Sequence, residues 1–272
     1  MPDSHQPPIT LRPFRTQIDQ APSSTTDRVA AVLLAFAGSS DPLGVSEIAR
    51  NCALSKAVVH RILQSLLQAG LVAYVPADRR YKLGPAALAL GRHAMRQDDL
   101  YAAGAPTIAH LAEVTGETST LSARIGHRRR YIAQVESAHR IRVAVQVGEV
   151  VGLAVGASGM AILAFMPQDD IDHVLSQPLS AYTEKTVTDP EQIRARLEQI
   201  RANGWVHTSG ERMHHSSSVA APIFDAAGEP AGALSIAYFA ERRPDPRRLV
   251  DLVLTASSEV SQRLQQRQLG LD

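Results

Sequence analysis

Several kinds of residue and segment are scarce in this chain of 272 residues, and each absence argues against a class of protein. The single cysteine, Cys52, cannot form an internal disulfide, and its position at the apolar end of an expected helix predicts a core residue, not a nucleophile. Aromatic residues are only 4% of the chain, too few for the stacking platforms that bind single-stranded nucleic acids. Neither a signal peptide nor an apolar run of about 18 residues is apparent, so we expect a cytoplasmic protein that does not contact a membrane.

The charge is also nearly balanced, at a formal +1, so any affinity for a polyanion must come from a local patch. Residues 25–95 carry eight Lys/Arg against four Asp/Glu, which concentrates cations in the N-terminal part of the chain. A second basic run, Arg128-Arg129-Arg130, is expected in a solvated hairpin turn between two strands. A glycine-rich loop of the P-loop or Rossmann kind is missing, and we expect no cofactor.

Residues 45–84 have the pattern of two short helices followed by a two-stranded ribbon. The first helix spans Val45–Asn51, and Cys52-Ala53-Leu54 interrupts its apolar stripe. Ser55 is a typical N-cap for the second helix, and Gly70 is a typical residue after its end. Between them, apolar residues recur at helical spacing on one face: Val58, Val59, Ile62, Leu63, Leu66 and Leu67.

The opposite face of the second helix is polar and basic, and two short strands, at residues 71–75 and 81–83, flank a turn with two arginines. A helix narrow enough for the major groove, followed by a basic ribbon that can lie on phosphates, indicates a winged helix-turn-helix. The residues expected on double-stranded DNA are Ser55, Lys56, Ala57, His60, Arg61, Gln64, Arg79, Arg80 and Tyr81. The alternative is a sensor that contacts a partner protein through the same surface.

The remaining pattern suggests domain boundaries. Residues 1–24 are rich in proline and predict a flexible arm. Residues 25–84 form the expected DNA-binding domain, whose first helix begins with a cap at Thr26 or Asp27. Residues 85–104 predict a linker helix that follows this domain.

In residues 105–272, strands joined mainly by turns are interspersed with grouped helices, which favours an α+β fold with an antiparallel sheet covered by helices. Strands are expected at Thr118–Ile125, Tyr131–Val135, Arg140–Val147, Trp205–Thr208, Val219–Phe224 and Ala231–Tyr238. Helices are expected at Gly156–Phe165, Asp169–Leu175, Pro190–Ala202 and Pro244–Arg267.

The chain resembles the IclR family of bacterial transcriptional regulators over nearly its whole length after the arm. The resemblance rests on VSEIAR, LSKAVVHRIL, QAGLV and YKLGP in the first half, and on LAVGASGMAILAFMP, Gly204-Trp205, Glu211 and VAAPIFDAAGEPAGALSIA in the second. It implies a winged-helix DNA reader, a linker helix, and an effector domain similar to GAF and PAS sensors. It also implies a ligand-responsive regulator that is not an enzyme and that binds a palindromic operator as a homodimer or a dimer of dimers.

The resemblance further implies an effector pocket at the start of the glycine-bearing helix, in the loop after the Gly-Trp pair, and on the strands behind them. Matched by motif, the effector-binding residues are Ala157, Ser158, Thr208, Glu211, Ser216, Ser218 and Ser235. Thr208 stands where the family often has aspartate, and Ala53 stands where it often has glycine. We expect a small-molecule effector with a carboxylate, which can be aromatic, held in part by backbone N–H groups at the helix start.

Two further patterns have alternative interpretations. His207, His214 and His215 could ligate a metal, but only Glu211 is spaced to extend the set, so we expect a polar loop and no metal. Ser158 could be the nucleophile of a small-molecule hydrolase. Its motif lacks the second spacer of G-x-S-x-G, however, and we expect it to be the N-cap of a helix.

Overall fold

The computed structural model describes residues 24–39 and 41–271, without the side chains of Met95 and Arg96. The chain divides after Ala87 into two compact units, each with its own hydrophobic core. Apart from Ser24, the arm expected over residues 1–24 lies outside the described residues. Within the described part of the chain, no helix combines the length and the apolar character needed to cross a membrane.

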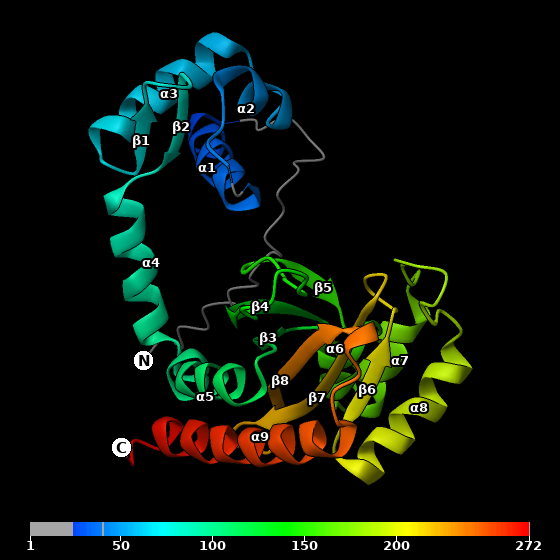
Figure 1. The fold of residues 1–272 in the computed structure, drawn as a ribbon. Helices are drawn as coiled ribbons and strands as arrows, with labels where there is room; N and C mark the ends of the chain where they lie inside the picture. The colour runs from blue at the N-terminus through cyan, green and yellow to red at the C-terminus, as the bar shows by residue number, and fades with distance from the viewer. Residues whose placement is uncertain (1–23, 40, 272) are drawn as a thin grey trace, which may run out of the picture. The chain divides into compact units, whose positions relative to one another are not determined.

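The first unit is built from helices α1 to α3 and the ribbon β1–β2 (Figure 1). α1 spans Thr25–Ala35 and continues as a 3-10 turn over Phe36–Gly38; α2 spans Val45–Asn51, α3 Lys56–Gln68, β1 Val72–Val75 and β2 Arg80–Leu83. Ser24 caps α1, because its hydroxyl accepts from the N–H of Asp27 while the Asp27 carboxylate accepts from the N–H of Ser24. The expected cap at Thr26 or Asp27 was therefore wrong, and both residues lie in the first turn.

The apolar faces of the three helices form the core of this unit. Val32, Ile48 and Leu63 are fully buried in it, and burying such side chains contributes about 1.5–3 kcal/mol each. The ribbon closes the core from the side, since Tyr81 is buried and its backbone pairs with Leu43. This core fixes which side of α3 faces solvent.

The expected limits of α3 are confirmed. The hydroxyl of Ser55 caps the helix by accepting from the N–H of Val58, and Gly70 follows its end with a φ of +69°. The turn before it contains Ala53, whose φ of +52° lies in the left-handed region that favours glycine. The chain therefore makes this turn at a cost in backbone strain.

The helix expected over residues 85–104 is interrupted. α4 spans Pro85–Gln97 and α5 spans Asp99–Thr115. Asp98 lies between them with extended backbone angles and caps α5 by accepting from the N–H of Tyr101 at 2.9 Å. Adjacent aspartates begin a helix more readily than they continue one, which explains the break.

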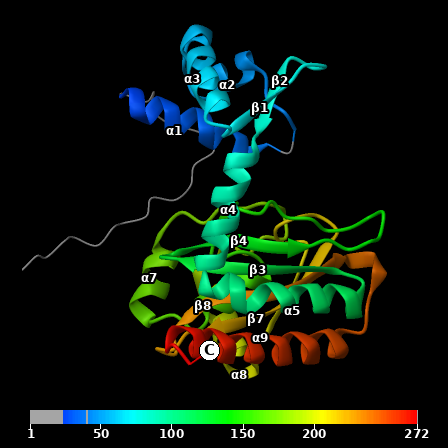
Figure 2. The same cartoon turned by 90° about the vertical axis from the view of Figure 1, so that its left-hand side faces the viewer.

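The second unit contains an antiparallel sheet in the order β5-β4-β3-β8-β7-β6, as expected for an α+β fold (Figures 1 and 2). Its strands are β3 Thr118–Ile125, β4 Arg128–Val135, β5 Val150–Gly152, β6 Val206–Ser209, β7 Ser216–Phe224 and β8 Pro230–Phe239. Its other helices are α6 Gly156–Leu163, α7 Gln168–Ser176, α8 Pro190–Asn203 and α9 Pro246–Gln268. α5 and α9 share one core with the sheet, whereas α6, α7 and α8 share the core on the opposite face.

The strand expected at residues 140–147 is not formed. Val143 and Val145 have no strand partner, and β5 pairs with β4 instead. Side chains satisfy this segment's backbone: the hydroxyl of Thr118 donates to the carbonyl of Val143 at 2.5 Å, and Gln134 accepts from the N–H of Val145 at 2.7 Å. Its alternating apolar residues therefore mark an extended segment outside the sheet ladder.

The strain at Ala53 gives a stability prediction. A left-handed alanine costs roughly 1–2 kcal/mol, so we expect Ala53→Gly to raise the free energy of unfolding by about 0.5–1 kcal/mol after the added unfolded-state entropy is subtracted. Ala30→Gly, at an exposed position inside α1, is the control and should lower it by about 0.5–1 kcal/mol. Urea denaturation of the full-length variants measures both, and an Ala53→Gly no more stable than the wild type would contradict the strain.

Candidate functional site

The polar face of α3 is exposed, and the residues expected at DNA on this helix all lie on it: Ser55, Lys56, Ala57, His60, Arg61 and Gln64. Val59, Ile62, Leu63 and Leu66 are buried on the opposite side and set this orientation. Among the described residues, the side chains of Lys56, His60 and Arg61 have no hydrogen-bond or ion-pair partner. They are available to an external acceptor.

The wing adds two arginines with different environments. Arg79 is exposed in the turn between β1 and β2 and has a φ of +53°. The guanidinium of Arg80 donates to the carbonyl of Pro42 at 2.7 Å and to the carboxylate of Glu47 at 3.3 Å. Arg80 therefore fastens the ribbon to the start of α2, while Arg79 is directed only to solvent.

Tyr81, in contrast, does not lie on the exposed face of the ribbon. It is 4% exposed, and its ring centroid lies 5.1 Å from that of Tyr74. The expected contact of Tyr81 with DNA was wrong because successive strand residues point to opposite faces, and Tyr81 takes the core face. Lys82, which the sequence interpretation omitted from the site, is exposed on the same side of β2 as Arg80. Strand alternation alone could have identified it.

In the second unit, the residues expected at the effector site line one cavity. They are Ala157 and Ser158 of α6, Thr208 of β6, Glu211 of the following loop, Ser216 and Ser218 of β7, and Ser235 of β8. Thr120 of β3 joins them, with its hydroxyl 2.7 Å from that of Ser235. The free space between these side chains is about 40 Å³, room for a few water molecules, so a larger ligand requires the lining to open.

Arg129 also lines this cavity, contrary to the solvated turn expected for residues 128–130. The turn lies earlier, at Gly126-His127, and β4 begins at Arg128. Arg129 pairs with Val151 of β5 and is 1% exposed, whereas Arg128 is exposed. The basic residues on either side of Arg129 predict that its side chain is exposed. Because side chains alternate along a strand, however, Arg129 points into the cavity while Arg128 points to solvent.

The other charged groups of this cavity are paired. The pairs are Arg212 with Glu149, at 2.5 Å, and Arg196 with Glu211, at 2.8 Å. Burial lowers the pKa of Arg212, but Tyr131 and Glu149 outweigh this effect and raise its pKa above the ordinary value, so it stays charged. Among the described residues, the Nε and Nη1 atoms of Arg129 have no hydrogen-bond partner.

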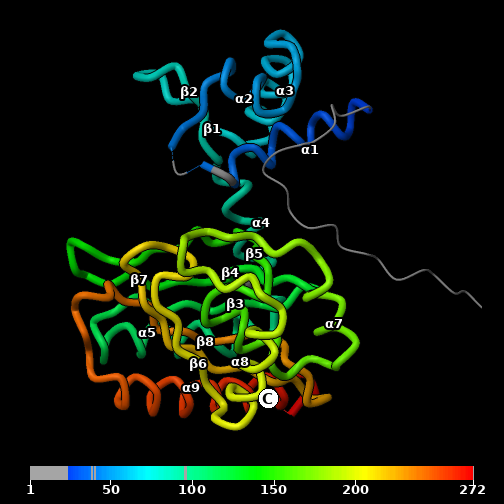
Figure 3. The backbone as a smooth tube through the Cα atoms, turned by 90° about the vertical axis from the view of Figure 1, so that its right-hand side faces the viewer, coloured from blue at the N-terminus to red at the C-terminus, as the bar shows by residue number. Residues whose placement is uncertain are grey.

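The segment between α7 and α8, whose course can be followed in Figure 3, is hydrogen-bonded to the loop after β6. The hydroxyl of Thr183 donates to the carbonyl of Gly210, and that of Thr186 donates to the carbonyl of Glu211, both at 2.6 Å. Because Glu211 lines the cavity, these hydrogen bonds connect the segment to the cavity wall.

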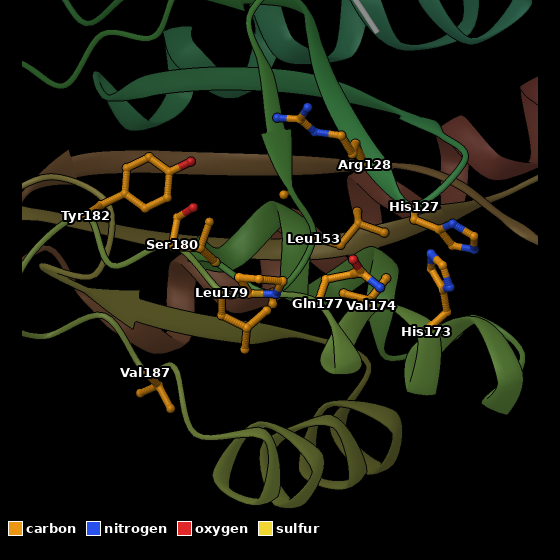
Figure 4. A pocket seen from close by; sticks show the side chains of 14 residues that line it. His127, Arg128, Leu153, His173, Val174, Gln177, Leu179, Ser180, Tyr182 and Val187 are labelled. Atoms are coloured by element: carbon orange, nitrogen blue, oxygen red, sulfur yellow. The ribbon is translucent and has the colours of Figure 1, made fainter. Parts of the chain in front are cut away.

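A larger cavity of about 310 Å³ adjoins the same segment (Figure 4). Leu153 and Leu179 form part of its apolar wall, and the rings of His127 and His173 lie together at one end, with centroids 4.4 Å apart and their planes tilted by 36°. Its cation, Arg128, is exposed and already donates to a backbone carbonyl. This cavity contains none of the expected effector residues and no buried unpaired charge, so it is the weaker candidate for an anionic ligand.

The three histidines considered as metal ligands, His207 of β6 and the loop residues His214 and His215, have separate partners. His207 lies 3.1 Å from the hydroxyl of Tyr238, His214 lies 3.5 Å from Glu184, and His215 lies 2.6 Å from Glu241. Burial lowers the pKa of His207 and favours its neutral form. In the part of the chain that the structure describes, no group of three or more His, Cys, Asp or Glu side chains could hold a metal ion.

Ser158 does not have the expected capping role. Val155 is the N-cap of α6, and Ser158 is the third residue of the helix. Its hydroxyl is buried and has no hydrogen bond to a histidine or carboxylate among residues 24–39 and 41–271. A serine nucleophile needs such a base, so this geometry does not favour hydrolysis.

The family comparisons cover both units. The model of the IclR C-terminal domain of bacterial transcriptional regulators matches residues 92–262, and the IclR helix-turn-helix domain matches residues 25–76. The HTH-type transcriptional regulator BhcR of Paracoccus denitrificans is 33% identical over 86% of this chain and 85% of its own length. The glycerol operon regulatory protein of Streptomyces griseus is 32% identical over 84% of this chain and 89% of its own length.

Solved structures agree with this assignment. An IclR transcriptional regulator from Alicyclobacillus acidocaldarius is 28% identical, with a TM-score of 0.78 over 88% of this chain and 98% of that protein. An IclR homologue from Microbacterium hydrocarbonoxydans, solved with 4-hydroxybenzoate, is 22% identical and shares the fold, with a TM-score of 0.78 over 89% of this chain and 99% of that one. The protein therefore belongs to the IclR family of bacterial transcriptional regulators, a family of DNA-binding proteins and not of enzymes.

Proposed function

We propose that this protein binds a palindromic operator through α3 and the β1–β2 wing, and that a small carboxylate-bearing molecule in the second unit changes its affinity for DNA. The observation that carries the proposal is the exposed face of α3, where Lys56, His60 and Arg61 have no side-chain partner within the described part of the chain, while the opposite face is buried in the core. Such a regulator of a metabolic or catabolic operon acts in the cytoplasm.

The roles on DNA follow from the chemistry of each group. Lys56, His60 and Arg61 lie on the face that would meet base edges in the major groove, where lysine or arginine can donate to O6 and N7 of guanine. Ser55 and the N-terminal turn of α3 would meet a phosphate. Arg79 and Lys82 would lie on the flanking backbone, in a position that the anchored side chain of Arg80 helps to fix.

A palindromic operator requires two copies of the chain with matching half-sites. Leu88 and Leu90 on α4 are 65% and 64% exposed. They are two residues apart and so lie on different sides of the helix, and a second subunit that packs along α4 can cover part of their apolar area. We infer a homodimer, or a dimer of dimers, as the DNA-binding species.

The effector class follows from the cavity wall. Its hydroxyl groups, the start of α6 and the buried cation Arg129 favour a negatively charged, hydrogen-bonding ligand. The homologue from Microbacterium hydrocarbonoxydans is complexed with 4-hydroxybenzoate, an aromatic carboxylate, which supports the same class. The ligand regulates DNA binding if it favours one conformation over another by about 1–3 kcal/mol.

The proposed function can be tested by sequencing the genomic DNA fragments that stay bound to the purified protein. Purified full-length protein should select a small set of fragments that share a palindrome, and its affinity should fall steeply as salt increases, because phosphate contacts release counterions. Weak DNA binding that barely depends on salt would instead favour a sensor that acts through protein contacts.

The groove assignment predicts a loss of selectivity in Arg61→Ala. Removing a base contact should weaken operator binding by about 1–3 kcal/mol and reduce the preference for operator over unrelated DNA. Gln68→Ala, at the exposed far end of α3, is the matched control and should bind as the wild type does. Fluorescence anisotropy with operator and scrambled duplexes measures both properties. Wild-type affinity and selectivity in Arg61→Ala would show that this face does not read bases.

The wing assignment predicts a different effect for Arg79→Ala and Lys82→Ala. Each should weaken binding to operator and scrambled DNA by a similar factor and reduce the slope of log affinity against log salt by about 1. Asp78→Asn, in the same turn, is a control that removes a negative charge and should not weaken binding. Measuring the affinity of each variant for both duplexes at several salt concentrations tests this prediction. An unchanged slope of log affinity against log salt would show that these cations do not contact phosphates.

A further inference from the structure

We propose that Arg129 is the anion receptor of the effector cavity, and that it selects effectors with a single carboxylate on a compact apolar or hydroxylated body. This inference deepens the proposed function and rests on it, since it concerns the same cavity. It is carried by the burial of Arg129, by the lack of hydrogen-bond partners for its Nε and Nη1 among the described residues, by its position beside α6, and by the pairing of the other charges there.

Arg129 is a buried cation without a counterion. It is 1% exposed, and its Nε and Nη1 atoms donate to no other described residue. The ring of Tyr131, with its centroid 4.6 Å from the guanidinium carbon, attracts the cation but does not neutralise it. Because a guanidinium keeps its proton at any ordinary pH, an uncompensated one is costly to bury, and an anion would relieve that cost.

The guanidinium lies along the first turn of α6. A Cβ placed on Gly159 would be 3.1 Å from its Nε, and one placed on Gly156 would be 3.7 Å from its Nη2. No side chain caps this helix, since Val155 is the N-cap, and its first N–H groups have no helical acceptor. A helix N-terminus carries partial positive charge and cannot compensate a cation. Both groups therefore favour an anion at the same place.

The remaining charges limit that anion to one negative charge. Arg212 is compensated by Glu149, and Glu211 is compensated by Arg196, so these pairs contribute no net charge. Only Arg129 is uncompensated among the described residues that line the cavity. A monocarboxylate balances it, whereas a dicarboxylate brings a second negative charge for which the described lining offers no free cation and which meets the carboxylate of Glu211.

The rest of the wall describes the body of the ligand. Val143, Val145 and the ring of Tyr131 are apolar, while Thr120 and Ser235 present hydroxyl groups. A lining of this kind fits a hydrocarbon or aromatic body with few polar substituents. The narrow free space favours a small molecule over an extended one.

The first test needs no ligand. In Tris buffer free of carboxylates and phosphate, we expect Arg129→Met in the full-length protein to raise the melting temperature by about 2–8 °C, because an apolar side chain of similar length replaces an uncompensated charge. Arg128→Met, at the exposed neighbouring position, is the matched control and should change it by less than about 2 °C. An Arg129→Met that melts no higher than the wild type overturns the proposal.

The second test uses sodium benzoate, with benzamide as its neutral analogue, phthalate as a dianion, and sodium chloride at equal ionic strength. Benzoate alone should raise the melting temperature of the wild type and of Arg128→Met. Arg129→Met should lose this shift, and Arg129→Lys, which keeps the charge without the bidentate fork, should bind benzoate about tenfold more weakly or worse. Equal shifts in the wild type and Arg129→Met, or no shift in the wild type, refute the role of Arg129.

Retention of genomic fragments separates this proposal from the proposed function. If the wild type selects operator fragments but its benzoate response does not depend on Arg129, the anion receptor is wrong and the regulatory function stands. If the benzoate response depends on Arg129 but no fragments are selected, the regulatory function is wrong and the anion receptor stands.

Discussion

Successive side chains of a β-strand point to opposite faces, and this constraint places the decisive residues of both units. In the wing it sends Tyr81 into the core and leaves Lys82 outside. In β4 it sends Arg129 into the proposed effector cavity and leaves Arg128 exposed. Tyr81 thereby anchors the ribbon in the core that it shares with α3. Arg129 thereby becomes a buried cation in the cavity, although its basic neighbours in the sequence suggest an exposed position.

Much of the helical structure could be predicted because its signals are local. The apolar stripe of α3, the cap at Ser55 and the glycine after its end act within a few turns of one another, and the exposed face follows once the buried face is known. Gly116 and Gly204 likewise end α5 and α8 in the left-handed conformation. The effector cavity was different: periodicity does not show that α6, β6, β7 and β8 meet, and only the order of family motifs brought its residues together.

The errors occur mainly where a distant partner decides the structure. Residues 140–147 alternate as a strand does, but the edge of β4 pairs with β5, and no local signal records that choice. The three arginines at 128–130 have the composition of a solvated turn, yet the turn lies at Gly126-His127. This small shift places all three arginines in β4, where strand alternation buries Arg129. The break at Asp98 was a local signal that the apolar pattern around it concealed.

The same alternation relates the proposed effector cavity to α5, the helix that follows α4 in the sequence. Thr120 lines the cavity, and the next residue of β3, Leu121, points to the opposite face and is fully buried in the core shared with α5. The packing is close, since a Cβ on Gly104 of α5 would lie 2.7 Å from Cδ2 of Leu121. Interiors packed this tightly transmit a displacement instead of absorbing it. Because α5 follows α4 directly after Asp98, and α4 begins in the first unit, a ligand that shifts β3 has a packed and covalent route to the DNA-binding unit.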